Sequence, residues 1–336
     1  MTCRTTPLLP LKTVSLVLWV TVLGCSSGEV DGPRNKVSDS GETMGDGDEE
    51  AEDEAAAVRP LAEVSGVCPD LSATGFVTFE SAGEERNASI VVPSVPSDDM
   101  PLVFFFHGLM DPGSTPEPTE YMVRGLELQR LANAHNAVVV VPEAPIYALA
   151  GFSFFLWDIA LETDADLVLF DDLRTCVAEQ LPVDLRRTTA WGFSGGALWT
   201  TVMASQRGDA FAAIVEASGG SDISVPIWSE LGARYETPTH PMPALLISGG
   251  ASDTWPQGSF SLVDFETATD NLEQQLIDDG HTVVSCHHTA GHTLPNQAYT
   301  LSIDWVLAHE YGMPSPWADG DLGTHDDWCA LMSAGG

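Results

Sequence analysis

The sequence predicts an α/β fold in which a mostly parallel central sheet carries helices on both faces. Short apolar runs alternate with segments of helical spacing, and this alternation is typical of parallel sheets. Several of these runs are apolar at every position, which is expected of strands buried on both faces. One run ends in a G-x-S-x-G sequence around Ser194, where a sharp strand-to-helix turn is expected.

The first half of the folded region supplies the opening strands and two helices. Strands are predicted at 75–81, 87–93, 102–106 and 137–141 because these stretches are rich in Val, Ile, Phe and Thr. Helices are predicted at 117–134 and 166–181. In the second helix, Leu169, Leu173 and Val177 recur in steps of four, which places them on one face.

The second half continues the alternation and carries the G-x-S-x-G turn. Strands are predicted at 188–193, 211–217, 244–248 and 282–286, and helices at 264–277 and 294–310. The strand at 188–193 ends directly at Ser194. In sheets of this kind, ligands and reactive groups gather where the parallel strands end.

Residues 1–24 have the composition of an export signal. A basic start with Arg4 and Lys12 precedes an apolar run at 13–23, which is too short to span a bilayer as a helix. Val22-Leu23-Gly24-Cys25 resembles a bacterial lipobox, which predicts that Cys25 is the lipidated first residue of the mature protein. Leu23 is uncommon at its position in that motif, so the sequence leaves two destinations open, a cell-envelope lipoprotein and a secreted protein.

Residues 25–60 are predicted to form an acidic disordered linker. The stretch 28–57 contains eleven acidic residues, two basic residues and no aromatic residue, so it cannot bury enough apolar surface to offset its ordering entropy. The remaining residues, 61–336, suit one sizeable domain. We expect this domain to be monomeric and to contact a membrane only through the N-terminal lipid anchor.

The charge of the chain limits its partners. The formal net charge is −36, and the folded region has no lysine and only nine arginines against 38 acidic residues. Nucleic acids and anionic membranes are therefore excluded as expected partners. Such a surface resembles those of proteins from saline environments.

Four cysteines fall in the folded region: Cys68, Cys176, Cys286 and Cys329. In an exported chain they predict two disulfides, with three connectivities open, and buried free thiols are the alternative. The chain has no C-x-x-C pair and no His-Cys cluster with zinc spacing, so no metal site is predicted.

Ser194 is the predicted nucleophile. A serine hydroxyl attacks well when a strained turn lifts it clear of the backbone and a histidine takes its proton. Small residues two before and two after the serine relieve the crowding of strand and helix, and here they are Gly192 and Gly196.

Asp253 and His292 are the predicted partners of Ser194. Asp253 follows the strand at 244–248, and His292 follows the strand at 282–286, so both lie at the edge where Ser194 is expected. The chain order Ser, Asp, His differs from the orders in chymotrypsin-type and subtilisin-type enzymes. We expect His292 to act as base and Asp253 to orient its ring. The competing residues are given capping, strand or surface roles: Asp222, Asp264, His287 and His288.

Two backbone amides are predicted to form the oxyanion hole, which stabilises a tetrahedral intermediate. Gly195 directly follows the nucleophile and supplies one amide. The second is expected from the loop after the strand at 102–106, where Leu109 is the first choice and Met110 the second. His107 is expected to shape this loop rather than to act as a base.

These motifs together resemble one family. P-L-V-F-F-F-H-G, V-D-L-R-R-T-T-A-W-G-F-S-G-G, S-G-G-A-S-D-T-W-P and G-H-T-L-P are similar to the polyhydroxybutyrate depolymerase and feruloyl esterase group of α/β-hydrolases. The resemblance covers about 102–307 and implies the α/β-hydrolase fold and cofactor-free hydrolysis of carboxylic esters. The chain departs from the pattern at Leu294, where an aromatic residue often precedes the proline. The loop after Gly108 also lacks the usual cysteine or glutamine.

The sequence therefore predicts an exported serine esterase that acts on neutral small-molecule or polymeric esters. Aromatic residues between 145 and 160, together with Trp228 and Trp255, are candidates to line an acyl or aryl pocket, with core packing as the alternative for Phe154 and Phe155. Two other functions stay open: a peptidase or amidase that uses the same three residues, and a surface binding protein on a hydrolase scaffold. The sequence does not identify the acyl group, and the acidic, aromatic tail at 317–328 has no assigned role.

Overall fold

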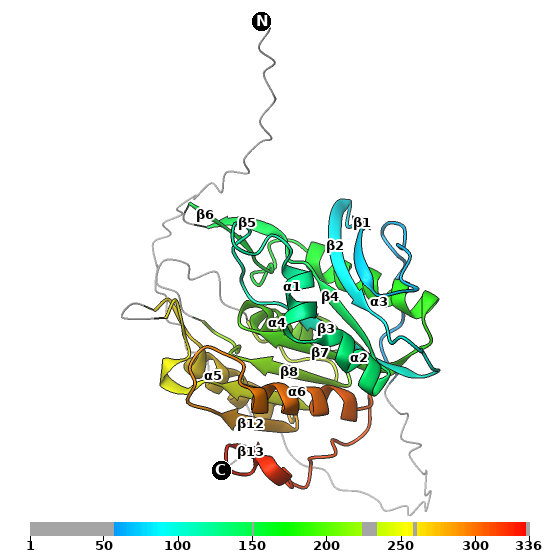
Figure 1. Ribbon diagram of the computed structural model, residues 1–336. Coiled ribbons are helices and arrows are strands. Elements are labelled where there is room, and N and C mark those ends of the chain that lie inside the picture. The colour runs from blue at the N-terminus through cyan, green and yellow to red at the C-terminus, as the bar shows by residue number, and fades with distance from the viewer. Residues whose placement is uncertain (1–56, 150, 224–233, 258–260, 334–336) are drawn as a thin grey trace, which may run out of the picture. The chain divides into compact units, whose positions relative to one another are not determined.

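The computed structural model describes residues 57–149, 151–223, 234–257 and 261–333. The predicted export signal, the lipidation site Cys25 and nearly all of the predicted linker lie outside these residues, as does Trp228. Within them, residues 61–333 are organised around a nine-stranded sheet with the strand order β1-β2-β4-β3-β7-β8-β9-β12-β13 (Figure 1).

The centre of the sheet is parallel and its edges are antiparallel. Parallel pairing joins β4, β3, β7, β8, β9 and β12, whereas β2 pairs antiparallel with β4 and with β1, and β13 pairs antiparallel with β12. The strands of this sheet are β1 Gly75–Ser81, β2 Glu84–Val91, β3 Met100–Phe106, β4 Val138–Pro142, β7 Val183–Phe193, β8 Ala213–Ala217, β9 Ala244–Ser248, β12 Val283–His287 and β13 Cys329–Met332.

Helices cover both faces of the sheet, as predicted. Leu102, Phe104 and Phe106 of β3 pack into one apolar cluster with residues of α3, α4 and α5, while Val103 and Phe105 pack into the other with residues of α2 and α6. Successive side chains of a strand point to opposite faces, so one fully apolar strand serves both layers. The helices are α1 Pro118–Gly125, α2 Leu128–His135, α3 Ala165–Gln180, α4 Gly195–Arg207, α5 Phe265–Asp278 and α6 Asn296–Ala308.

The structure departs from the predicted elements in three places. The helix expected at 117–134 is two helices, because Glu127 has a positive φ of 49° between α1 and α2. β7 begins at Val183 rather than at 188. Small elements were also missed: the hairpin β5 Ile146–Leu149 and β6 Phe152–Phe155, the pair β10 Thr254–Trp255 and β11 Val263–Asp264, strand β13, and 3-10 turns at Gly208–Ala210, Gly250–Ser252 and Gly323–His325.

Two disulfides confirm the prediction from the cysteine count. Cys68, which precedes β1, is bonded to Cys176 on α3, and Cys286 on β12 is bonded to Cys329 on β13. The second pair lies directly opposite in the antiparallel register. Of the three connectivities that the sequence left open, this is the one in the structure.

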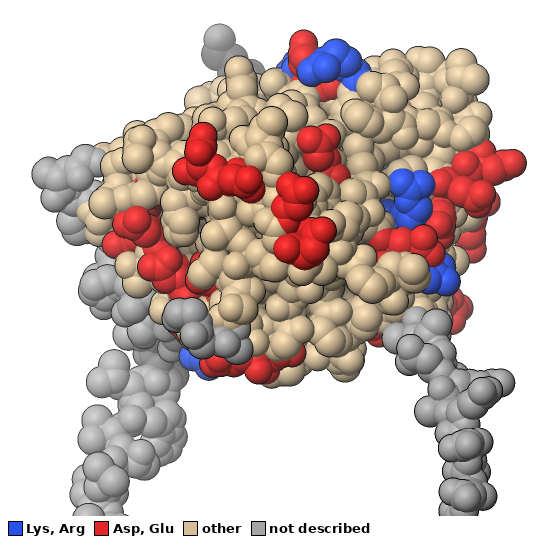
Figure 2. Space-filling view, turned by 90° about the horizontal axis from the view of Figure 1, so that it is seen from below, with Lys and Arg blue, Asp and Glu red and all other residues tan. Residues whose placement is uncertain are grey.

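The surface reflects the acidic composition. On the face shown in Figure 2, acidic side chains are spread widely and basic ones are few. Several arginines pair with aspartates, as Arg207 does with Asp171 at 2.9 Å and Arg86 with Asp166 at 2.6 Å. Among the described residues, no helix is long and apolar enough to cross a membrane.

Candidate active site

Ser194 lies at a sharp turn between β7 and α4, where the sequence predicted it. Its backbone has a φ of 57° and a ψ of −124°, a strained conformation for a residue with a side chain. A Cβ atom on Gly192 would lie 2.3 Å from the Gly196 carbonyl oxygen, and one on Gly196 would lie 1.9 Å from the Phe106 carbonyl oxygen. Gly192 is therefore required for β7 and α4 to approach this closely, and Gly196 is required for α4 to approach the end of β3.

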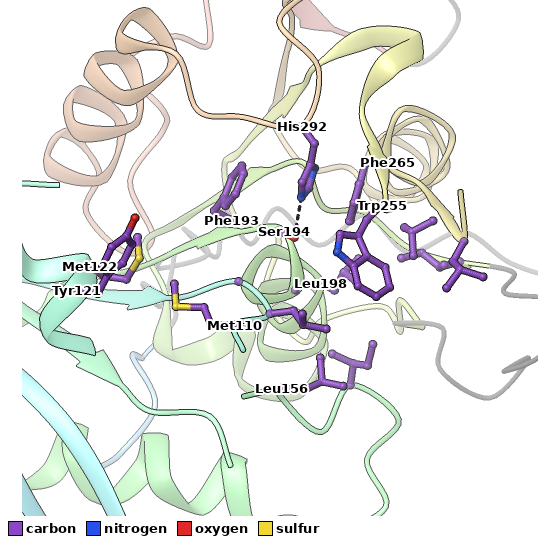
Figure 3. Close-up of a pocket in the computed structure, with 17 residues that line it drawn as sticks. Met110, Tyr121, Met122, Leu156, Phe193, Ser194, Leu198, Trp255, Phe265 and His292 are labelled. Atoms are coloured by element: carbon purple, nitrogen blue, oxygen red, sulfur yellow. Dashed lines mark hydrogen bonds between the residues drawn. The ribbon is translucent and has the colours of Figure 1, made fainter. Parts of the chain in front are cut away.

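The structure brings His292 and Asp253 to Ser194. The Nε2 atom of His292 is 2.9 Å from the Ser194 hydroxyl oxygen (Figure 3). Its Nδ1 atom is 2.7 Å from an Asp253 carboxylate oxygen. An Nδ1–H that donates to Asp253 leaves Nε2 free to accept the serine proton. Three side chains from three separate loops thus form one continuous hydrogen-bonded row at the carboxyl edge of the sheet.

The Asp253 carboxylate is fully buried and is held by two donors besides His292. Its Oδ2 atom accepts hydrogen bonds from the Ser218 hydroxyl at 2.8 Å and from the Gly249 amide at 2.7 Å. Sequence reasoning missed Ser218. It directly follows β8, and its place at the same strand-end edge as Ser194 is the signal that could have found it.

The ring of His292 lies between two phenyl rings, which sequence reasoning also missed. Phe265 stacks on it with ring centroids 4.5 Å apart, and Phe193 with centroids 5.1 Å apart. Both faces of the imidazole are covered, so the ring is held in the plane that joins Ser194 to Asp253.

The loop after β3 is anchored by His107. Its Nδ1–H donates to the Gly108 carbonyl at 2.8 Å, its Nε2 accepts the Ala144 amide at 3.1 Å, and its own carbonyl accepts the Trp157 indole N–H at 2.9 Å. Burial lowers the pKa of His107 to about 4, so the ring is neutral at neutral pH. The predicted role of His107 in shaping the loop agrees with these contacts.

This anchoring sets the direction of the Leu109 amide. In a trans peptide, the Leu109 N–H points opposite to the Gly108 carbonyl that His107 holds. The Leu109 nitrogen lies 3.2 Å from the position that a Cβ atom on Gly195 would take, so the two predicted amides are neighbours. The Met110 amide, the second choice, instead donates to the Phe155 carbonyl at 3.3 Å.

The competing residues have other partners. Asp264 caps α5 by accepting the Thr267 amide at 3.1 Å, as expected of a capping residue. Asp222 accepts from the Gln275 side chain, and His287 is bonded to the Ser248 hydroxyl. His288 accepts the Ala290 amide within its own turn.

A cavity of about 350 Å³ opens above Ser194 and is lined almost entirely by apolar side chains. In Figure 3, Met110, Met122 and Tyr121 lie on one side of Ser194, and Trp255, Leu156 and Phe265 lie on the other. Trp255 lines the cavity as expected, and Phe154 packs edge-on against it with ring centroids 6.4 Å apart. Phe155 and Trp157 are buried in the core instead.

The sequence matches no family model and no curated protein. Solved structures are similar in fold. A variant of pOPH in complex with DMSO has a TM-score of 0.62 at 16% identity, with 80% of this chain and 97% of that chain covered. Native sOPH has a TM-score of 0.60 at 16% identity, with 79% of this chain and 96% of that chain covered. With this topology and these neighbours, the chain has the α/β-hydrolase fold.

Proposed function

We propose that the protein is an exported serine esterase that hydrolyses neutral carboxylic esters through an acyl-enzyme on Ser194. The single observation that supports this most is the hydrogen-bonded row Ser194, His292 and Asp253, of which Ser194 and His292 line an apolar cavity. A serine hydroxyl in this arrangement has both a base to take its proton and space for an ester beside it.

The reaction begins when His292 Nε2 takes the Ser194 proton as the hydroxyl oxygen attacks the ester carbonyl. The amides of Gly195 and Leu109 stabilise the oxyanion of the tetrahedral intermediate. His292 then donates the proton to the leaving alcohol, and the acyl group remains on Ser194. A water molecule, activated by the same imidazole, releases the acid and restores the serine. Asp253 stabilises the imidazolium at each step, and Ser218 and Gly249 keep it in place.

The cavity favours esters with apolar groups on both sides of the scissile bond. Among the described residues that line it, only His292 and Tyr121 are titratable, so this part of the lining offers little to bind a charged group. The acidic surface further disfavours anionic substrates. The resemblance to polyhydroxybutyrate depolymerases and feruloyl esterases makes hydroxyalkanoate and aryl esters the first substrates to examine. An amidase would use the same residues, and a binding protein would bind such esters without turning them over.

Two features support export. The disulfides Cys68–Cys176 and Cys286–Cys329 are typical of proteins outside the reducing cytosol. The lipobox-like sequence that ends at Cys25 further suggests a lipid anchor, which Cys25→Ser would abolish. Labelling with a fatty-acid probe in a bacterial host would then occur in the wild type and be lost in the variant, whereas equal labelling of both would contradict the anchor.

A substrate panel on the purified full chain tests the esterase proposal. Matched aryl esters and anilides, short-chain esters and hydroxyalkanoate esters would be compared in the wild type and in Ser194→Ala. We expect hydrolysis of esters but not of anilides, and labelling by a fluorophosphonate that the variant loses. Faster anilide hydrolysis would indicate an amidase, and a folded wild type that is not labelled would indicate a binding protein.

A further inference from the structure

A buried carboxyl group lies beneath the proposed catalytic residues, and the mechanism above does not use it. Glu216 on β8 is 1% exposed. β8 lies between β7, which ends at Ser194, and β9, which leads to Asp253. Glu216 therefore sits on the strand that separates the nucleophile from the acid.

The residues that pair with Glu216 in the sheet or contact its side chain carry no charge. Gly192 on β7 and Leu246 on β9 are its neighbours in the sheet. Thr201 on α4 reaches it, and Gly219 and Gly220 cover it where the chain leaves β8. The same loop packs on α5 at Ala268 and Thr269. No cation compensates the carboxyl group at any of these positions.

The hydrogen bonds of Glu216 locate its proton. The Thr201 hydroxyl oxygen lies 2.9 Å from Glu216 Oε1, and 2.9 Å from the Gly220 carbonyl oxygen. A carbonyl oxygen only accepts and a hydroxyl group has one hydrogen, so Thr201 cannot donate to both. The conflict disappears when Glu216 is protonated and donates to Thr201, which then donates to Gly220.

The second carboxyl oxygen completes the ring. Glu216 Oε2 accepts the Gly220 amide at 2.9 Å. Every polar atom of the ring then has a partner, as buried polar atoms require. Burial also raises the pKa of Glu216 to about 8, against smaller opposing effects of the hydrogen bonds that the carboxylate form would accept from Thr201 and Gly220, so the neutral acid is the main form at neutral pH.

The ring connects the two sides of the proposed catalytic row. Thr201 belongs to α4, the helix that starts directly after Ser194. Gly220 lies two residues after Ser218, whose hydroxyl donates to Asp253. Ser218 has a positive φ of 52°, a conformation that its surroundings must hold in place.

We propose that Glu216 is a positioning residue that acts as a neutral carboxylic acid, tying α4 to the loop that presents Ser218 to Asp253. The catalytic part of this inference rests on the proposed esterase function, while the protonation part does not. Loss of the Glu216 proton breaks the ring, loosens Ser218 and weakens its hold on Asp253.

Glu216→Gln is the main test, because an amide of the same shape donates to Thr201 and accepts from Gly220 without a titrating proton. Glu85→Gln, at an exposed carboxylate on β2, is the matched control. Urea unfolding of the full chain with its disulfides intact would be measured from pH 4.5 to 9.

A folded-state pKa above the unfolded value gives stability that is complete at low pH and is lost as pH rises to the folded value. The unfolding constant of the wild type, divided by that of Glu216→Gln, should therefore rise about tenfold per pH unit between the ordinary pKa of 4.5 and the folded-state pKa of about 8, and level off above it. The corresponding ratio for Glu85→Gln should not change with pH. A flat ratio for Glu216→Gln would overturn the neutral acid, whether or not the protein hydrolyses esters.

Activity separates positioning from stability. We expect kcat of the wild type to fall above pH 8 at temperatures where it stays folded, and kcat of Glu216→Gln to persist to higher pH, with KM unchanged in both. Thr201→Val, which removes the ring at all pH values, should lower kcat about tenfold at pH 7, the order of one lost buried hydrogen bond. Identical pH profiles of wild type and Glu216→Gln would overturn the positioning role. Absence of any ester hydrolysis and of fluorophosphonate labelling would instead remove the esterase proposal and the catalytic part with it, while the unfolding ratio would still decide on the neutral acid.

Discussion

Two histidines near Ser194 follow central parallel strands and have opposite surroundings. His107, after β3, is fully buried, and both of its ring nitrogens are bonded to backbone groups. His292, after β12, lines the cavity, and its ring nitrogens are bonded to the side chains of Ser194 and Asp253. Closeness to the serine motif in the fold does not identify the base. The proposed base, His292, is the histidine whose ring nitrogens contact a serine hydroxyl and a carboxylate, whereas those of His107 contact only backbone groups of its loop and nearby chain.

Removal of His292 should have the largest effect on activity. His292→Ala eliminates the proposed base. Loss of the serine or the histidine of a serine, histidine and aspartate set usually costs nearly as much as loss of all three, so kcat for an aryl ester should fall about 10⁴-fold or more. Steady-state kinetics with a far-ultraviolet spectrum to confirm folding would measure this. A loss of less than tenfold would break the comparison, because another group would then be the base.

Replacement of His107 should cost less and act differently. His107→Phe fills the same space but releases the Gly108 carbonyl, so the Leu109 amide turns away from the oxyanion and kcat falls about 10²-fold. KM should change little. His107→Asn keeps a donor for Gly108 and should recover part of the loss. A drop as large as that of His292→Ala, with no recovery in His107→Asn, would contradict the loop role.

Folding stability at acidic pH should also reveal the buried histidines. Burial lowers the pKa of His107 to about 4, and that of His309, which lies between the Trp305 carbonyl and the Ser315 hydroxyl, also to about 4. A lowered folded-state pKa means stability that is complete above the ordinary value of 6.5 and is lost as pH falls toward 4. The free energy of unfolding of the wild type, measured in urea, should fall as pH falls across this window. That of His309→Gln should fall less steeply. An equal pH dependence of the unfolding free energy in the two proteins would show that His309 is already charged in the folded protein.

The smallest effect is expected at the substrate wall. Trp255→Ala removes one side of the cavity and an edge contact with Phe154, so KM for aryl esters should rise about tenfold, equivalent to about 1.4 kcal/mol of lost apolar contact. kcat should be nearly unchanged, unlike in the histidine variants. Phe76→Ala, at an exposed position on β1, is the control and should alter neither constant.

The sequence was sufficient to predict what local patterns encode. The strands with continuous apolar runs, the turn at Ser194 and the loops that carry Asp253 and His292 follow from spacing and composition, because parallel strands bring their carboxyl ends to one edge. Contacts between distant segments could not be predicted from the sequence. Ser218, after β8, contacts Asp253, and Phe265, at the start of α5, contacts His292, and their types are common in any protein of this composition.

The missed elements have physical reasons as well. β13 is a strand because it pairs with β12, and its own four residues carry little strand signal. The sequence predicts that the aromatic stretch after β4 lines a pocket or packs in the core, but in the β5–β6 hairpin Phe152 is 69% exposed. The break between α1 and α2 depends on one left-handed residue, Glu127, and Gly125 at the end of α1 is the one local signal for it in the sequence.

The Cys68–Cys176 bond has a mechanical consequence. A pull on the chain from its N-terminal side passes at residue 68 directly to residue 176, so the 107 residues between them carry no load. That shielded stretch contains the whole loop after β3, with Leu109, and the hairpin beside it. Tension applied to the chain before residue 68, as through the proposed anchor at Cys25, would therefore leave the loop after β3 unstretched.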